Sequence, residues 1–432
     1  MKINIFWFRR DLRLDDNTAL DKALSSGLPV LPVFIFDTNI IEELQPDDPR
    51  INFIYESLAR INAELNKTGS SVLIRKGDPA ETWKELMELY DINAVYTNKD
   101  YEPYSIQRDN TIEKLLQRKG ISFFIFKDQV IYEEREILKH DNTAYTVFTP
   151  YKNRWLKEFI EHQNEILNSK TENKINYYSC IYHFQLLEEF GFRKSTIRIR
   201  PFDLSVIPDY HKYRDTPSAD KTSYLSPHLR FGTISIRKII EKAFRENMSF
   251  LNELIWREFF MQILYNFPDV VTVNFRSVYD DINWRNNEKE FQRWCQGETG
   301  YPIVDAGMRQ LNSTGYMHNR VRMITAGFLC KHLLTDWRWG EAYFARKLLD
   351  YELSSNNGNW QWASGTGCDA APYFRVFNPG IQEKKFDPWQ LYIRRWIENP
   401  GKPDYPEKIV DHEFARQRAL AVYKAGIRKR II

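Results

Sequence analysis

A carboxyl group, an indole and a guanidinium fall on one predicted helical face in the segment NELIWREFF, residues 252–260. Glu253, Trp256 and Arg257 stand at positions i, i+3 and i+4, which lie on the same side of an α-helix. Together they offer an acid, a stacking surface and a cation, an unusual combination for a core stripe. The ordinary alternative is a Glu–Arg surface pair beside a half-buried Trp.

Two further segments could line a ligand site. In GYMHNRVRMITAGF, residues 315–328, Asn319, Arg322 and Met323 share a helical face, although ordinary helix decoration has the same spacing. The run NNGN at residues 356–359 predicts a break in the helix that brings backbone amides and short amide side chains close to a ligand. The alternative there is a tight turn with packed aromatic side chains around Trp360 and Trp362.

Hydroxyl groups precede a predicted helix in TSYLSPHL, residues 222–229. Hydroxyls and free N–H groups at a helix start suit a phosphate group. Thr222 or Ser223 as a plain N-cap is the alternative.

The first part of the chain alternates β-rich runs with amphipathic helical stretches. This order predicts a parallel sheet with helices on both faces. No GxGxxG turn follows the first run, so the sequence does not predict NAD on a glycine-rich helix start. The predicted strands are residues 3–8, 30–35, 72–76, 94–97 and 122–126.

The rest of the chain divides into a connection and a helical part. Residues 127–209 read as a long irregular linker, and residues 210–432 as a mostly helical domain interrupted by Gly and Pro. Residues 1–200 carry 28 basic and 31 acidic residues, whereas residues 201–432 carry 33 and 27. The basic second half favours a polyanionic partner.

Composition excludes several classes of protein. Apolar residues make up 43% of the 432 residues, so the chain can form a packed core and is not globally disordered. Its four scattered cysteines predict neither a zinc site nor a disulfide framework, and no metal site is expected. Without a signal peptide or a long apolar run, we expect a soluble cytoplasmic protein.

The motifs together resemble the DNA photolyase/cryptochrome family along essentially the whole chain. FWFRRDLRLDDNTAL at residues 6–20 is similar to the N-terminal signature of the family, and NELIWREFF and TSYLSPHLRFGTIS are similar to its FAD domain. So are GYPIVDAGMRQLNSTGYMHNRVRMITAGFL and NNGNWQWASGTGCDAAPYFRVFNP. The greatest resemblance is to class I photolyases, which split cyclobutane pyrimidine dimers.

The resemblance implies a fold and an activity. The fold is an α/β domain with a five-stranded, Rossmann-like parallel sheet (residues 1–126), a linker (127–209) and an all-α FAD- and DNA-binding domain (210–432). The implied enzyme is a monomer that binds damaged DNA, flips the dimer out of the helix and splits it with an electron from photoexcited reduced FAD.

The resemblance also implies roles for individual residues. Those matching FAD contacts are Tyr210, Thr222, Ser223, Tyr224, Leu225, Ser226, Glu253, Arg322, Asp350, Tyr351, Glu352 and Asn356. Those matching the dimer pocket and DNA contacts are Arg214, Glu253, Trp256, Arg257, Asn319, Arg320, Met323, Trp362 and Gln382. An electron chain to the flavin would run through Trp360, Trp337 and Trp284.

These roles make chemical sense. Trp256 and Trp362 can stack on a flipped dimer at about 1–3 kcal/mol each. Glu253 can stabilise charge on a pyrimidine carbonyl if burial keeps it protonated, and Asn356 can accept a hydrogen bond from flavin N5–H. Tyr104 and Ser105 replace the Asn-Glu of folate-binding relatives, so a second, antenna chromophore stays open among folate, deazaflavin, flavin and none.

Three other interpretations are weighed against a dimer photolyase. A cryptochrome-type photoreceptor often carries a longer C-terminal extension and would not need the dimer-pocket residues. A (6-4) photolyase has a histidine pair where this chain has Asn319 and Met323, with only His318 adjacent. Without the resemblance, a nucleotide-binding protein with a basic helical module would remain.

Overall fold

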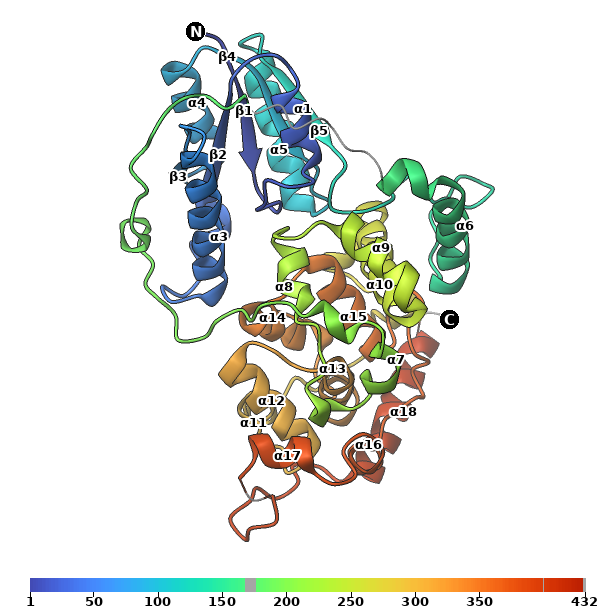
Figure 1. Ribbon diagram of the computed structural model, residues 1–432. Coiled ribbons are helices and arrows are strands. Elements are labelled where there is room, and N and C mark those ends of the chain that lie inside the picture. Colours follow the sequence, from blue (N-terminus) through green and yellow to red (C-terminus); the bar gives the residue numbers. More distant parts are fainter. Residues whose placement is uncertain (168–175, 399, 430–432) are drawn as a thin grey trace. The chain divides into compact units, whose positions relative to one another are not determined.

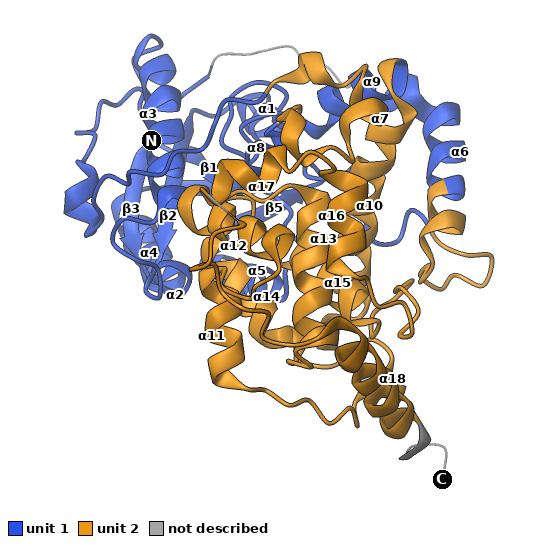
Figure 2. Ribbon diagram, turned by 90° about the horizontal axis from the view of Figure 1, so that it is seen from below, with its two compact units in different colours: residues 1–137, 153–202, 224–245 blue, residues 138–152, 203–223, 246–432 orange. Residues whose placement is uncertain are grey.

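The computed structural model describes residues 1–167, 176–398 and 400–429. The chain forms two compact units (Figure 2). Unit 1 contains residues 1–137, 153–202 and 224–245, and unit 2 contains residues 138–152, 203–223 and 246–432. Each unit is therefore assembled from segments that are distant in the sequence.

Unit 1 is built on the five-stranded parallel sheet that the sequence predicts (Figure 1). The strand order is β3-β2-β1-β4-β5, and every neighbouring pair is parallel. The strands are β1 (Ile3–Phe8), β2 (Val30–Asp37), β3 (Leu73–Gly77), β4 (Ile92–Asn98) and β5 (Ser122–Phe126). The predicted strands are thus confirmed to within a few residues at their ends.

Helices cover both faces of this sheet, and the strand side chains alternate between them. Phe6 and Phe8 pack in one apolar cluster with side chains of α1 and α3, whereas Ile5 and Trp7 pack in another with α4 and α5. The helices up to residue 117 are α1 (Thr18–Leu24), α2 (Thr38–Ile41), α3 (Pro49–Asn66), α4 (Pro79–Leu89) and α5 (Pro103–Gln117).

The connection that follows is mostly irregular. It contains α6 (Phe148–Leu167) and the short 3-10 turns Leu187–Phe190 and Leu204–Val206. Unit 1 also includes α8 (Leu225–Arg230) and almost all of α9 (Ile236–Glu246). Gly232 between them has a φ of +64°, and a Cβ there would lie 2.1 Å from the Arg10 carbonyl oxygen, so only glycine fits.

Unit 2 is helical, as predicted. Its longest fully internal helix is α10 (Met248–Asn266), whose Leu251, Ile255 and Phe259 are fully buried. Around it lie α7 (Tyr210–Tyr213), α11 (Glu288–Gln296), α12 (Pro302–Thr314), α13 (Asn319–Gly327), a π-helical turn (Phe328–His332), α14 (Trp337–Lys347), α15 (Leu353–Ser364), α16 (Pro379–Phe386), α17 (Leu391–Trp396) and α18 (His412–Lys429). Short 3-10 turns occupy Pro217–Ala219, Pro268–Val271 and Ser277–Tyr279. None of the described helices combines the length and apolarity needed to cross a bilayer.

The predicted helix break at NNGN is wrong, because α15 runs through it. Tertiary contacts outweigh the low helix propensity of Asn and Gly. The Asn357 side chain donates to the Val270 carbonyl at 3.0 Å. Gly358 lies against Phe260, whose ring would be 2.2 Å from a Cβ at that position. The helical conformation also places Trp360 and Trp362 on different faces, with Trp360 buried and Trp362 half-buried.

Candidate functional site

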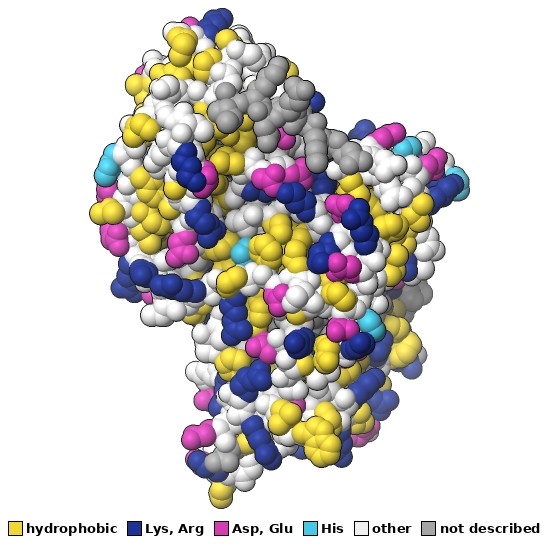
Figure 3. Space-filling view, in the orientation of Figure 1, with side chains coloured by type: hydrophobic (Ala, Val, Ile, Leu, Met, Phe, Trp, Pro, Cys, Tyr) yellow, Lys and Arg dark blue, Asp and Glu magenta, His cyan; other side chains and the backbone are white. Residues whose placement is uncertain are grey.

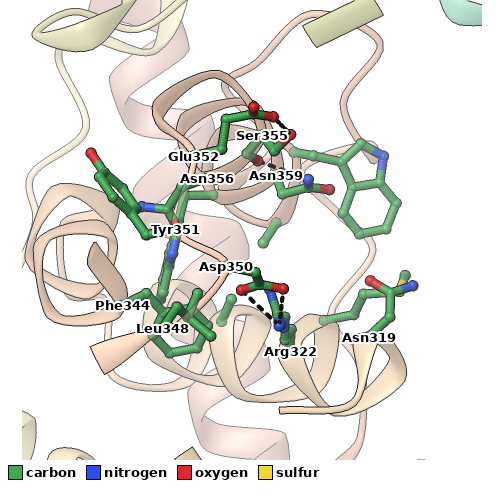
Figure 4. Close-up of a pocket in the computed structure, with 15 residues that line it drawn as sticks. Asn319, Arg322, Phe344, Leu348, Asp350, Tyr351, Glu352, Ser355, Asn356 and Asn359 are labelled. Atoms are coloured by element: carbon green, nitrogen blue, oxygen red, sulfur yellow. Dashed lines mark hydrogen bonds and ion pairs between the residues drawn. The ribbon is translucent and has the colours of Figure 1, made fainter. Parts of the chain in front are cut away.

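A pocket opens in unit 2 between α13, α14, α15 and the segment that joins the last two (Figure 4). It encloses about 610 Å³ of space, partly open to solvent. The lining residues are Asn319, Arg322, Met323, Ala326, Phe344, Leu348, Asp350, Tyr351, Glu352, Ser355, Asn356, Asn359, Trp360, Trp362 and Ala363.

An ion pair lies on one wall of the pocket, as Figure 4 shows. Arg322 Nη2 donates to both carboxylate oxygens of Asp350, at 2.9 and 3.2 Å, and Arg322 Nε donates to the Met317 carbonyl. The structure therefore brings together two of the residues that the resemblance places among the FAD contacts. The backbone contact fixes the guanidinium while it neutralises the Asp350 carboxylate.

The Asn356 side chain is oriented by a residue that the sequence analysis missed. Asn356 Nδ2 donates to the Glu341 carbonyl oxygen at 3.1 Å and to Glu341 Oε1 at 2.9 Å. Both of these bonds use the amide nitrogen, so the Asn356 carbonyl oxygen can accept from a ligand. Burial raises the pKa of Glu341. No local motif identifies Glu341, because it lies on α14, 15 residues before Asn356.

Glu352 connects the pocket to α10. Its carboxylate accepts from Ser355 Oγ at 3.1 Å and pairs with Arg257 at 3.3 Å. Arg257, which the resemblance places among the DNA contacts, thus lies beside a buried pocket carboxylate. This long-range pair replaces the Glu253–Arg257 surface pair that was the alternative from spacing.

The other residues of the α10 face have partners outside the helix. Glu253 pairs with Arg214 at 2.9 Å, and the Arg214 guanidinium lies over the Tyr210 ring. Burial is the largest cause of a raised pKa at Glu253, although Arg214 opposes it. Trp256 stacks on Phe148 with ring centroids 3.7 Å apart and planes 9° apart. One face of the indole is therefore covered by Phe148, an aromatic side chain that no motif singled out.

The start of α13 positions three further candidates. Arg320 pairs with Asp215 at 2.5 Å and contacts Met323 Sδ at 3.4 Å. His318 caps the helix, because its Nδ1 accepts from the Arg320 backbone N–H at 3.1 Å. Burial lowers the pKa of His318 to about 4, so this imidazole is neutral at pH 7. Gln382 lies half-buried on α16, whose Phe386 ring is 4.5 Å from the Arg320 guanidinium.

The predicted phosphate-binding segment is divided between the units. Thr222 and Ser223 belong to unit 2, while Tyr224, Leu225 and Ser226 belong to unit 1. Neither Thr222 nor Ser223 caps α8, because the N-cap position is Tyr224, with φ of +51° and no side-chain capping bond. The plain N-cap alternative is therefore wrong.

The three predicted electron-transfer tryptophans differ in exposure. Trp360 is 2% exposed and Trp337 is fully buried, whereas Trp284 is half-buried. Trp337 Nε1 donates to Asn274 Oδ1 at 2.9 Å. Trp360 also contacts Trp294 edge-on, with ring centroids 6.2 Å apart. Trp294 was not selected from the sequence.

The region considered for an antenna chromophore lies in unit 1. Tyr104 Oη donates to Asp37 Oδ2 at 2.7 Å, and the Arg108 guanidinium lies over the rings of Tyr104 and Trp7. Burial and the Asp37 carboxylate raise the pKa of Tyr104 to about 12. Ser105 is buried on α5.

Comparisons with known proteins agree with this architecture. Residues 4–168 match the family model described as DNA photolyase, and residues 250–402 match the FAD binding domain of DNA photolyase. A deoxyribodipyrimidine photo-lyase of Halobacterium salinarum is 35% identical over 98% of this chain and 99% of its own length.

Two crystal structures are similar over nearly the whole chain. A class III photolyase from Agrobacterium tumefaciens is 32% identical, with a TM-score of 0.84, over 99% of this chain and 98% of that one. An archaeal photolyase from Sulfolobus tokodaii with two FAD molecules is 36% identical, with a TM-score of 0.82, over 98% and 100%.

Proposed function

The chain belongs to the DNA photolyase family, and we propose that the pocket of unit 2 holds FAD while the adjoining residues of α10 and α13 bind the flipped pyrimidine dimer. The enzyme is a deoxyribodipyrimidine photo-lyase that repairs DNA in light. The residue roles below deepen that assignment.

The pocket residues suit FAD in shape and in hydrogen bonding. Phe344, Leu348 and Trp360 offer apolar surface to a flat ring system. Arg322 and Asp350 add a donor and an acceptor to the lining. Bound FAD in its reduced form absorbs light and supplies the electron that splits the dimer.

Asn356 is the residue that we expect to tune this cofactor. Glu341 holds its amide nitrogen, so the carbonyl oxygen is the group left to accept a hydrogen bond. An acceptor at that position favours a protonated ring nitrogen and therefore the reduced flavin. Glu341 acts as its positioning residue.

The dimer itself would meet stacking and polar groups. Trp362 and Trp256 provide aromatic faces, and the Phe148 ring behind Trp256 keeps that indole in place. Asn319 and Glu253 can bond to pyrimidine carbonyl and N–H edges. A protonated Glu253 would donate to a carbonyl oxygen that gains negative charge, and the burial that raises its pKa favours this form.

The surroundings of His318 carry the choice of lesion. Repair of a (6-4) product would call on a histidine as a proton donor. Nδ1 of His318 is occupied as the acceptor of the Arg320 backbone N–H, so Nε2 carries the single proton of the ring, and burial lowers the pKa and keeps the imidazole from taking up a second proton. We therefore propose that cyclobutane dimers are the substrate and (6-4) products are not.

One blue-light assay tests this proposal. The purified protein, with bound yellow FAD, is illuminated with duplex DNA that contains either a cyclobutane dimer or a (6-4) product. We expect restoration of the dimer DNA alone. Comparable restoration of (6-4) DNA would overturn the choice of lesion, and failure with both substrates would favour a photoreceptor.

A monomeric state and a cytoplasmic location remain predictions from the sequence. Sedimentation of the FAD-bound protein, alone and with DNA, measures the first. The antenna chromophore is read from the absorbance of purified protein after its FAD spectrum has been subtracted.

A further inference from the structure

An almost fully exposed tryptophan lies on the surface of unit 2, away from the pocket lining. Trp389, between α16 and α17, is 76% exposed, although Trp is usually well buried. Ile381 and Leu391 on the flanking helices are also exposed. Figure 3 shows hydrophobic side chains gathered over this part of the surface, with Lys and Arg beside them.

The turn that carries Trp389 is rigid, so the exposure is not that of a loose loop. The buried Asp387 carboxylate accepts from the backbone N–H groups of Tyr392 and Ile393, at 3.0 and 2.9 Å. Gln390 has φ of +54°, and its side chain donates to Glu383 at 2.8 Å. These contacts fix the backbone that presents the indole to solvent, so little backbone ordering is left to be lost when a ligand binds there.

The charged residues around Trp389 indicate what kind of partner this surface binds. Lys384, Lys385, Arg394 and Arg395 are exposed on the same two helices. The two carboxylates of the segment, Glu383 and Asp387, accept hydrogen bonds from within it. An exposed ring among cations is the combination that binds single-stranded nucleic acid, in which cations contact phosphates and rings stack on bases.

This surface is continuous with residues that we assign to DNA. The Phe386 ring of α16 contacts two cations, the Arg320 guanidinium and the Lys385 ammonium group. Arg395 donates to the Ser218 carbonyl, three residues after the Asp215 partner of Arg320. A strand bound at Arg320 and Gln382 can therefore extend over the α16–α17 segment.

We propose that Trp389 stacks on an unpaired nucleobase of the DNA strand outside the dimer pocket. The proposal rests on the DNA-repair function of the chain and adds to it a contact that favours single-stranded over duplex substrate. In a duplex the bases are already stacked on one another, so the indole has little to gain. In a single strand every base has a free face.

The test compares affinities for an undamaged single-stranded oligonucleotide and for its duplex. Trp389→Ala should weaken single-strand binding by about 5- to 100-fold, the equivalent of one stacked base, and duplex binding by much less. Trp389→Phe should restore most of the loss. Phe124→Ala is the matched control, because Phe124 is an exposed ring on β5 of unit 1, in a run without cations, and it should change neither affinity.

Further measurements separate stacking from the alternatives. Trp389→Ala should leave the salt dependence of binding unchanged, whereas Lys384→Gln with Lys385→Gln should lower its slope by about two on a log–log plot. FAD content of each variant reports folding. An equal loss for single strand and duplex, no loss for either, or a change in oligomeric state with unchanged affinity would overturn the proposal. A wild-type protein that repairs no dimers would instead overturn the proposed function.

Discussion

The carboxyl edge of the sheet in unit 1 and the pocket in unit 2 are built from the same kinds of side chain but do different things. At the sheet edge, Asp109 accepts from both Arg9 and Arg108, and Arg10 pairs with Asp100. In the pocket, Arg322 pairs with Asp350 and Arg257 with Glu352. In the second case Arg322, Asp350 and Glu352 line the pocket described above.

The electrostatics of the two regions differ accordingly. At the sheet edge, the surrounding guanidinium groups lower the pKa of the buried Asp100, and the neighbouring carboxylates raise the pKa of Arg108. Near the pocket, burial raises the pKa of Glu253 and Glu341. The first region is thus a set of charges paired mainly with one another, and the second keeps polar groups that a ligand can use. Open parallel sheets usually bind ligands at their carboxyl edge. In this sheet the charged side chains at that edge pair with one another, so charged residues at such an edge are not by themselves evidence of a ligand site.

The largest expected difference between the regions concerns Asp109. Asp109→Ala removes the shared partner of two buried guanidinium groups, and the free energy of unfolding should fall by about 3–5 kcal/mol. FAD content per folded molecule should be unchanged.

Asp350→Ala should have the opposite pattern of effects. FAD should be lost, whereas the free energy of unfolding should fall much less, because the partner Arg322 is 29% exposed and can be solvated.

Urea unfolding and the FAD-to-protein absorbance ratio measure the two effects. Asp109→Asn is the conservative control, since it keeps an acceptor for one guanidinium. FAD loss from Asp109→Ala with stability unchanged would mean that the sheet edge, too, serves the cofactor.

The second effect concerns Trp337, which lies in the core of unit 2. Trp337→Phe should slow light-driven reduction of oxidised FAD by at least about tenfold, equal to 1.4 kcal/mol or more of barrier, because Phe is much harder to oxidise. Repair by chemically pre-reduced enzyme should survive. Trp83 is fully buried in unit 1, so Trp83→Phe is the control that should leave photoreduction intact. Equal photoreduction in wild type and Trp337→Phe would show another route, for which Trp339 and Trp294 are the candidates.

The sequence was sufficient wherever a pattern is local. Short β-rich runs in alternation with amphipathic helical stretches predicted the sheet of unit 1, and long motifs selected the pocket-lining Arg322, Asp350 and Asn356. It failed where distant contacts decide. The helix through NNGN forms because Gly358 lets α15 pack closely against Phe260 of α10. Helix propensity, which is a local property, cannot predict such a contact.

The missed partners share one cause. Glu341 orients Asn356, Phe148 stacks on Trp256, and Asp215 pairs with Arg320, yet none is within ten residues of its partner. The residues around a carboxylate or an aromatic ring in the sequence do not predict which distant side chain it will contact. The divided segment Thr222–Ser226 is a similar case, because its assignment to two units depends on packing across the chain.

A smaller effect is expected at the edge of the binding surface. Trp256→Ala should weaken binding of dimer-containing DNA by about 1–3 kcal/mol through lost stacking, and undamaged DNA, held mostly through phosphates, should be affected much less. Salt titration sharpens the result: Arg214→Ala should lower the log–log slope by about one, and Trp256→Ala should not change it. FAD release from Trp256→Ala, or an equal loss for both DNAs, would make this indole a structural neighbour of Phe148 only.

The smallest expected effect is a difference in how the two regions respond to pH, which one carboxyl group in each region, Glu253 and Asp100, determines. Burial raises the pKa of Glu253 above its ordinary value of 4.5, so just above pH 4.5 the folded protein holds a proton that the unfolded chain has released. Stability from this group therefore increases as pH falls from the raised pKa toward 4.5. Asp100 has the opposite sign: its pKa is lowered from 3.8, and the stability it contributes is lost as pH falls below that value.

If the protonated form of Glu253 donates to the dimer, affinity for dimer-containing DNA should rise in the same window as stability does, by no more than about tenfold per pH unit for one proton. Glu253→Gln carries a permanent N–H donor of similar shape, so its affinity should be nearly constant with pH and close to the low-pH value of the wild type. A Glu253→Gln variant that keeps the wild-type pH profile would place the titrating group elsewhere, and one whose affinity stays at the high-pH value would show that Glu253 binds the dimer as a carboxylate.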